Sequence, residues 1–126
     1  MSYRVIFCGS RNWHSWHPIL DAVLEMATEH PDLVVVTGGA RGADEMVDAY
    51  ARKLGLVVEK FPADWQGRGQ AAGPIRNAAM LAAGADEVVA FKDDFDYSMR
   101  RGGTENMIRI AQRAGVPTRV LTSSVD

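Results

Sequence analysis

The chain has 126 residues, 47% of them hydrophobic, a size at which one domain can bury a core of its own. Lys and Arg number 14 against 16 Asp and Glu, so the formal net charge is -2 and no global basic field is expected. Nucleic acid is therefore expected to be an unlikely partner. No apolar run reaches the length of a membrane span, and the N-terminus runs directly into a strand pattern, so we expect a cytoplasmic protein without membrane attachment.

Five short apolar runs, rich in β-branched residues, predict five strands. Because the runs are continuous and do not alternate with polar residues, they are typical of strands buried on both faces of a parallel sheet. The predicted strands are residues 4–8, 33–37, 56–61, 87–91 and 118–121.

Helical patterns fill the gaps between these strands. We expect the first helix to begin at Pro18, because proline is favoured at the opening position, and to end before Pro31. The other helices are predicted at about 44–54, 74–83 and 104–114, with residues 62–73 as an irregular, lid-like stretch. Strict strand–helix alternation predicts a Rossmann-like, doubly wound α/β/α sandwich formed by one domain over residues 1–126. Ligands of such sheets bind beyond the carboxyl ends of the strands.

The loop after the second strand has the strongest functional signal. Its sequence Thr-Gly-Gly-Ala-Arg-Gly-Ala-Asp lets successive backbone N–H groups turn toward an anion at the start of a helix. It matches neither a Walker A loop nor the dinucleotide fingerprint, so a magnesium-dependent NTPase is not expected. Asp44 is interpreted as the N-cap of the second helix or as a contact to a ribose hydroxyl. The candidate phosphate-binding residues here are Gly38, Gly39, Ala40, Arg41 and Gly42.

Three further segments are expected at the same edge of the sheet. The loop Gly9, Ser10, Arg11, Asn12 offers donors for a phosphate or ribose. Arg76 and Asn77 begin a helix, where they can face an anion. A second glycine loop follows the fourth strand, and its candidate residues are Gly102, Gly103 and Thr104.

An acidic turn at residues 92–96 holds three aspartates. Their spacing matches no calcium loop and no histidine accompanies them, so no metal is expected and no cofactor is predicted. Cys8 is the single cysteine, which excludes an internal disulfide.

Taken in order, these motifs resemble the SLOG superfamily of Rossmann-like domains, and within it the YspA-related DUF2493 branch. The resemblance covers nearly the whole chain. The superfamily includes the Lonely Guy phosphoribohydrolases, the DNA-processing Smf/DprA proteins, and sensor domains assigned nucleotide-derived or ADP-ribose-like ligands. Membership thus implies a nucleotide-like ligand more firmly than a reaction. The motifs are Gly9-Ser10-Arg11, the loop at 37–44, Gly73-Pro74-Ile75-Arg76-Asn77 with Met80, and Gly102-Gly103-Thr104.

The resemblance also implies catalytic candidates. In the phosphoribohydrolases a Pro-Gly-Gly-x-Gly-Thr-x-x-Glu motif provides a catalytic glutamate, which works with an arginine from an Arg-Lys segment. Arg76 resembles that arginine, and Asn77 stands at the lysine position. Met107 stands at the glutamate position, and the nearest carboxylate is Glu105, about 200° away around the helix. Arg76 and Glu105 are the tentative catalytic residues, although a first-turn glutamate also complements the helix dipole.

Three functions remain open from the sequence. The first is binding of a nucleoside monophosphate or ADP-ribose-like ligand through two glycine-rich phosphate loops. The second is hydrolysis of a nucleotide N-glycosidic bond, with Glu105 or Asp44 stabilising the oxocarbenium-like centre. The third, least favoured, is single-stranded DNA binding of the Smf/DprA kind. Because related domains commonly pair through helices, a homodimer or higher homo-oligomer is also expected. DNA binding would use Arg41, Arg68, Arg100 and Arg101 with Trp65 as a stacking platform.

Overall fold

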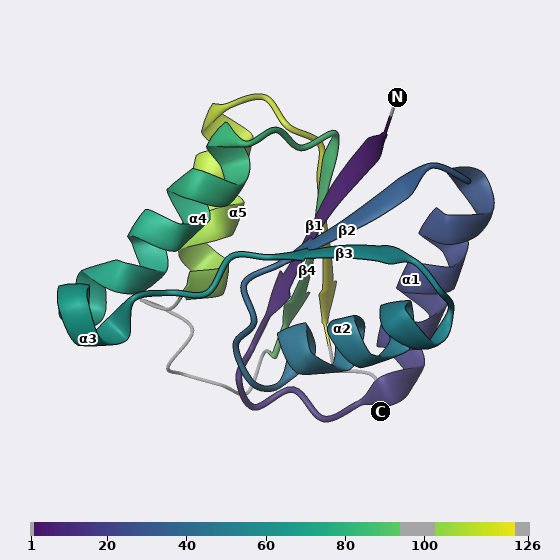
Figure 1. Cartoon of the computed structure of the whole chain (residues 1–126), viewed down its shortest axis with the longest axis horizontal. Coiled ribbons are helices and arrows are strands. Elements are labelled where there is room, and N and C mark those ends of the chain that lie inside the picture. The colour runs from purple at the N-terminus through teal and green to yellow at the C-terminus, as the bar shows by residue number, and fades with distance from the viewer. Residues whose placement is uncertain (1, 94–102, 123–126) are drawn as a thin grey trace.

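The computed structural model describes residues 2–93 and 103–122, and its centre is a five-stranded parallel sheet (Figure 1). The strand order is β3-β2-β1-β4-β5, and each neighbouring pair is parallel. This confirms the Rossmann-like α/β fold predicted from the sequence. The strands are β1 (Tyr3–Gly9), β2 (Leu33–Thr37), β3 (Val57–Lys60), β4 (Glu87–Lys92) and β5 (Thr118–Thr122).

Helices cover both faces of the sheet. Figure 1 shows α1 and α2 on one face and α4 and α5 on the other. Within the described ranges, no helix combines the length and the apolarity needed to cross a bilayer. The long helices are α1 (Trp16–Glu29), α2 (Ala43–Lys53), α4 (Ala72–Ala82) and α5 (Gly103–Arg113).

The stretch predicted to be irregular is largely helical. It contains the one-turn helix α3 (Trp65–Arg68) and the 3-10 turn η1 (Gly69–Ala71), and α4 follows directly. The carboxylate of Asp64 accepts a hydrogen bond of 3.0 Å from the backbone N–H of Gly67, which satisfies a donor at the start of α3. The prediction missed this capped turn because the glycine-rich composition of the segment is typical of an irregular loop.

Alternate strand residues enter two separate cores, which explains the continuous apolar runs. On β1, Val5 and Phe7 pack in the cluster beneath α1 and α2, whereas Ile6 and Cys8 pack in the cluster beneath α4 and α5. Alternate side chains of the central strands β2 and β4 enter the same two clusters. The three central strands are therefore buried on both faces, as predicted.

The two edge strands differ from that prediction. Val57 on β3 is 60% exposed and Val120 on β5 is 41% exposed. An edge strand has one neighbour, and the helices that cover the sheet centre do not extend fully over it. Apolar composition alone therefore overestimated the burial of β3 and β5.

The strand order reverses between β1 and β4. The chain runs from β1 through β2 to β3 on one side, and then returns to β4 on the other side of β1. Loops that leave β1 and β4 at such a point diverge to opposite faces and open a crevice at the carboxyl edge.

Paired valine substitutions test the difference between centre and edge. Val35→Ala removes two methyl groups from a fully buried site in β2 and is expected to lower the free energy of unfolding by about 2 kcal/mol. Val57→Ala, at the exposed edge, is expected to change it by less than about 0.5 kcal/mol. Chemical denaturation of both variants measures the two values, and equal losses would contradict the burial described here.

Candidate functional site

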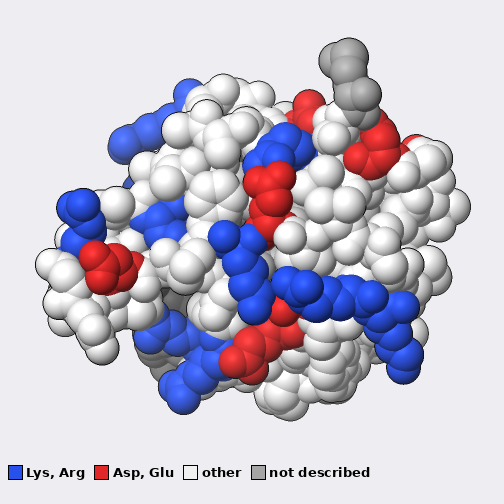
Figure 2. Space-filling view, in the orientation of Figure 1, with Lys and Arg blue, Asp and Glu red and all other residues white. Residues whose placement is uncertain are grey.

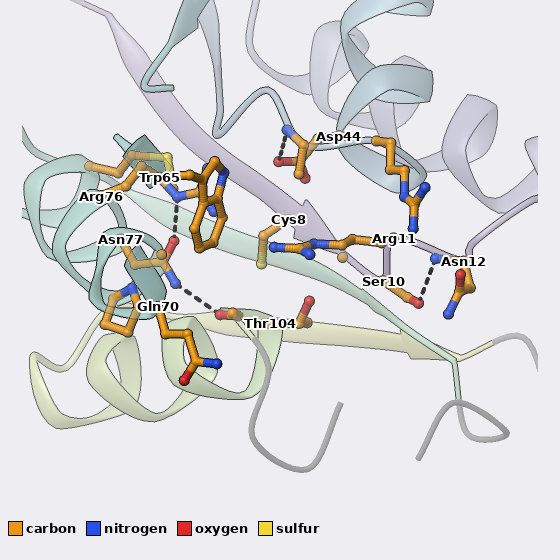
Figure 3. Close-up of a pocket in the computed structure, with 17 residues that line it drawn as sticks. Cys8, Ser10, Arg11, Asn12, Asp44, Trp65, Gln70, Arg76, Asn77 and Thr104 are labelled. Carbon is orange, nitrogen blue, oxygen red and sulfur yellow. Dashed lines mark hydrogen bonds between the residues drawn. The ribbon is translucent and has the colours of Figure 1, made fainter. Parts of the chain in front are cut away.

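The crevice at the sheet reversal holds a cavity of about 600 Å³ (Figure 3). Its walls come from the end of β1 and its following loop, from the loop after β2, and from α2, α4 and α5, with α3 and η1 at one side. The lining residues are Cys8, Gly9, Ser10, Arg11, Asn12, Ala40, Arg41, Asp44, Trp65, Gln70, Gly73, Pro74, Arg76, Asn77, Met80, Gly103 and Thr104.

The loops after β1 and β2 are bound tightly to each other. The backbone carbonyl of Ser10 accepts a hydrogen bond of 3.1 Å from the N–H of Ala43. Gly42 has a φ of +80°, and a Cβ there would overlap the carbonyl groups of Ser10 and Arg11. Glycine at this position is therefore required by the close approach of the two loops, whether or not an anion binds.

Asp44 is a buried carboxylate and not the N-cap of α2. The helix begins at Ala43 with Gly42 at the N-cap, so the N-cap interpretation of Asp44 is wrong. Asp44 is 4% exposed, and its Oδ2 accepts a hydrogen bond of 3.2 Å from the N–H of Ala40. Among the described residues, Oδ1 has no hydrogen-bond partner. The glycine loop thus encloses a carboxylate of the protein itself.

Burial dominates the electrostatics of Asp44. It raises the pKa of this carboxyl to about 6, although the hydrogen bond from Ala40, the charges of Arg76 and Arg11 and the nearby backbone of Gly38 favour ionisation. The same burial lowers the pKa of Arg76, and the Asp44 charge opposes that shift. A guanidinium remains charged at neutral pH, so the cavity contains two opposite charges that are both poorly solvated.

Arg76 is fixed by the backbone of the glycine loop. Its Nη1 donates a hydrogen bond of 2.7 Å to the carbonyl of Gly38, and its Nε donates one of 2.9 Å to Oδ1 of Asn77. A Cβ at Gly38 would overlap the guanidinium, so only glycine permits this contact. Nη2 has no hydrogen-bond partner in the ranges that the structure describes.

Asn77 connects α4 to the start of α5. Its side chain is 2% exposed, and Nδ2 donates to the carbonyl of Gly103 at 2.9 Å and to Oδ1 of Asn106 at 3.1 Å. At the position that a lysine occupies in the phosphoribohydrolases, this chain therefore has an internal hydrogen-bond bridge. The bridge sets Thr104, which is 6% exposed, against the cavity.

Glu105 does not line the cavity. Its carboxylate forms an ion pair of 2.6 Å with Lys92 at the end of β4. Met107, at the position of the phosphoribohydrolase glutamate, is fully buried in the core beneath α4 and α5. Asp44 is the carboxylate that the structure brings into the cavity beside Arg76.

Most of the predicted site residues meet at the cavity. The described exceptions are Gly38, Gly39, Gly42, Arg68 and Glu105. Gly102, Arg100 and Arg101 lie outside the described residues, as do Asp94 and Asp96 of the predicted acidic turn. The predicted residues in the lining are Gly9, Ser10, Arg11, Ala40, Arg41, Asp44, Arg76, Asn77, Gly103 and Thr104. Asn12, named with Ser10 and Arg11 as a donor, also lines the cavity. Sequence reasoning left out Cys8 and Gln70, cited Gly73, Pro74 and Met80 only as motif residues, and gave Trp65 a role only in DNA binding. The sequence signal for Trp65 was a large aromatic residue inside a glycine-rich segment, which could have indicated a ligand contact.

Charge in the cavity differs from charge over the whole molecule. Figure 2 shows acidic and basic side chains interspersed over one face. Among the described lining residues, by contrast, three arginines accompany one carboxylate. The charged lining residues are Arg11, Arg41, Arg76 and Asp44. The cavity therefore favours an anionic ligand.

Comparison with known proteins shows which family the chain belongs to. Residues 3–67 match the model of the YspA, cpYpsA-related SLOG family. Over 120 residues the chain is 42% identical to the Gene 61 protein of Mycobacterium phage D29, covering 90% of this chain and 92% of that protein. The chain belongs to the YspA-related SLOG family.

Two solved structures share the fold. DNA processing protein A from Helicobacter pylori, whose single-stranded DNA binding mode has been described, superimposes with a TM-score of 0.67 at 17% identity. The protein of the same name from Streptococcus pneumoniae gives a TM-score of 0.58 at 13% identity. The alignments cover 95% and 93% of this SLOG chain, which spans 65% and 58% of the respective neighbours.

These neighbours correct the expectation that nucleic acid is an unlikely partner. The fold is shared with a protein that binds single-stranded DNA, so the fold itself does not exclude a nucleic-acid partner. The expectation was wrong because it rested on the net charge of -2, which averages over the whole surface. Binding depends on the local field, and the described cavity lining has an excess of arginine.

Replacing Asp44 is expected to stabilise the empty protein. Between about pH 4 and pH 6 the folded chain retains a proton on Asp44 that the unfolded chain has released, so the free energy of unfolding falls as pH rises through this window. Asp44→Asn removes this dependence and is expected to raise the free energy of unfolding by about 1–3 kcal/mol at about pH 8. Denaturant unfolding of both proteins across this pH range measures the difference.

Glu45→Gln is the matched control, because Glu45 is the exposed neighbour of Asp44 in the first turn of α2. Because this variant retains Asp44, the fall in stability between about pH 4 and pH 6 is expected to remain. A loss of stability in Asp44→Asn at every pH would show that the hydrogen bonds of the carboxylate outweigh its burial.

Proposed function

We propose that this chain binds a nucleotide or nucleotide-derived ligand, such as a nucleoside monophosphate or an ADP-ribose-like molecule, in the cavity at the carboxyl edge of the sheet. The observation that carries the proposal is the buried Oδ1 of Asp44, which lacks a partner among the described residues in a cavity rich in arginine. A phosphorylated nucleoside offers an anion to the arginines and hydroxyl donors to the carboxylate, so it satisfies both kinds of group.

The phosphate is proposed to lie between Arg76 and the first turn of α5. Nη2 of Arg76 is available in the described part of the chain, and Gly103 leaves room beside it. The Thr104 hydroxyl and the N-terminal N–H groups of α5 add donors on the same side, and Arg11 adds a second guanidinium. The loop at 38–42 is proposed to act indirectly, because it encloses Asp44 and fixes Arg76.

The sugar is proposed to lie against Asp44. A carboxylate whose second oxygen is already hydrogen-bonded presents its first oxygen in one direction, which suits a single hydroxyl donor. A donated hydrogen bond favours the ionised form and offsets part of the desolvation. Ligand binding therefore relieves an unfavourable feature of the empty site.

Calorimetry with a panel of ligands tests the proposal. Nucleoside monophosphates and ADP-ribose are titrated into the wild-type chain and into Arg76→Ala, which removes a charge-assisted contact and is expected to weaken binding roughly tenfold or more. Arg109→Ala is the control, since Arg109 is an exposed arginine of α5 outside the cavity lining. Absence of binding across the whole panel would overturn the proposal.

Chromatography of the recovered ligand separates binding from cleavage. Binding alone returns the nucleotide intact, whereas the hydrolase alternative requires free base. In that alternative the carboxylate is Asp44, which lines the cavity, whereas Glu105 pairs with Lys92. Release of free base that is lost in Asp44→Asn but retained in Glu105→Gln would therefore favour hydrolysis through Asp44.

A second candidate is binding of a nucleotide unit within single-stranded DNA. The half-exposed Trp65 in the cavity lining favours it, and the fold neighbour from H. pylori binds such DNA. Fluorescence anisotropy with a labelled oligodeoxynucleotide at about 50 and 200 mM salt is expected to show binding that weakens steeply with salt if phosphates are contacted. Displacement of the oligonucleotide by a mononucleotide locates both in one site, whereas binding unaffected by mononucleotide and by Arg76→Ala would contradict this candidate.

A further inference from the structure

One large aromatic side chain lies half exposed at the side of the cavity. Trp65 is 45% exposed although its indole is among the lining groups (Figure 3). An indole that remains partly in water beside an arginine-rich cavity is an unused apolar surface of the kind that nucleobases cover.

The indole is held in place before any ligand binds. Asp64 caps α3 through the N–H of Gly67, and its backbone carbonyl accepts a hydrogen bond of 2.9 Å from the N–H of Arg68. On the other side, a Cβ at Gly73 would lie 3.3 Å from Cη2 of Trp65, so the ring rests directly on the start of α4. A side chain that is already ordered loses little entropy when a ligand stacks on it.

Arg11 lies over this ring in the ligand-free structure. The guanidinium carbon is 5.1 Å from the ring centroid, which is within cation–π range. In the described part of the chain, Arg11 makes no ion pair and no side-chain hydrogen bond. Figure 3 shows its side chain reaching across the cavity from the β1 loop. The cation–π contact therefore holds the guanidinium where a base would otherwise stack.

We infer that Trp65 is the base-stacking surface of the cavity and that Arg11 covers it only until a ligand arrives. This inference rests on the proposed function and deepens it, because it specifies a ligand with both an aromatic base and a phosphate. The base replaces the guanidinium on the indole, and the guanidinium moves to the phosphate. One weak contact is thereby exchanged for a stack and a charge-assisted pair.

The exchange predicts opposite responses of two ligands to one substitution. Trp65→Ala removes the stacking surface, so the tightest-binding member of the adenosine, guanosine, cytidine and uridine 5′-monophosphates is expected to lose roughly 5- to 150-fold in affinity. Ribose 5-phosphate has no base to stack, and Arg11 no longer has to leave the ring. Its affinity is expected to stay unchanged or to rise by up to about fivefold. Calorimetry on the full chain measures both.

Two further variants separate stacking from folding. Trp65→Phe retains an aromatic ring and is expected to give an intermediate loss for the nucleotide alone. Trp16→Ala removes a similarly exposed tryptophan, 48% exposed on α1 and outside the cavity lining, and is expected to change neither affinity.

Equal weakening of both ligands by Trp65→Ala would overturn the inference, because Trp65 would then only support the cavity wall. The proposed function would survive that result, since both ligands would still bind the wild-type chain. If no member of the calorimetry panel, ADP-ribose included, bound the wild-type chain, the proposed function would fail and this inference with it.

Discussion

The guanidinium of Arg76 is the group on which the geometry of the cavity depends. The side chain extends from α4 and donates hydrogen bonds to the backbone carbonyl of Gly38, after β2, and to Oδ1 of Asn77. The Asn77 amide in turn donates to the carbonyl of Gly103 at the start of α5. Segments far apart in the sequence are thus connected through one poorly solvated cation. Such a charge is tolerated because carbonyl and amide oxygens surround it and the Asp44 carboxylate lies nearby. A guanidinium suits this task because its donors form a rigid fork.

The fold could be predicted from the sequence because its signals are local and strong. Residues 5–8 of β1, 33–36 of β2 and 88–91 of β4 are apolar at every position, and Gly55 and Gly115 mark helix ends with positive φ. The prediction was weaker at β3 and β5, because an apolar strand at the edge of a sheet has the same composition as one at its centre. It was also weaker at α3, where a single capped turn leaves no periodic pattern.

The candidate site could be predicted in its membership but not in its division of roles. Parallel topology brings the carboxyl ends of the strands to one edge, where Arg11, Asp44 and Arg76 were expected and where the three line one cavity. The sequence of a glycine-rich loop, however, does not show whether its N–H groups are free for a ligand or donate to a carboxylate of the chain. Only coordinates show that the N–H of Ala40 is already engaged by Asp44 and that Gly38 accommodates an arginine. Long-range contacts of this kind leave no trace in sequence spacing.

The incomplete hydrogen bonding of Asp44 bears on how fast the protein is degraded in a cell. A buried oxygen with no partner in the described structure makes the empty cavity the less stable form, and a ligand that donates to it stabilises the fold by mass action. Proteolysis in cells acts on transiently opened chains, whose number rises as stability falls. Under the proposed function, the abundance of the protein would then follow the concentration of the ligand, with unoccupied copies removed first. A cavity that carries its own unfavourable charge can in this way couple turnover to occupancy.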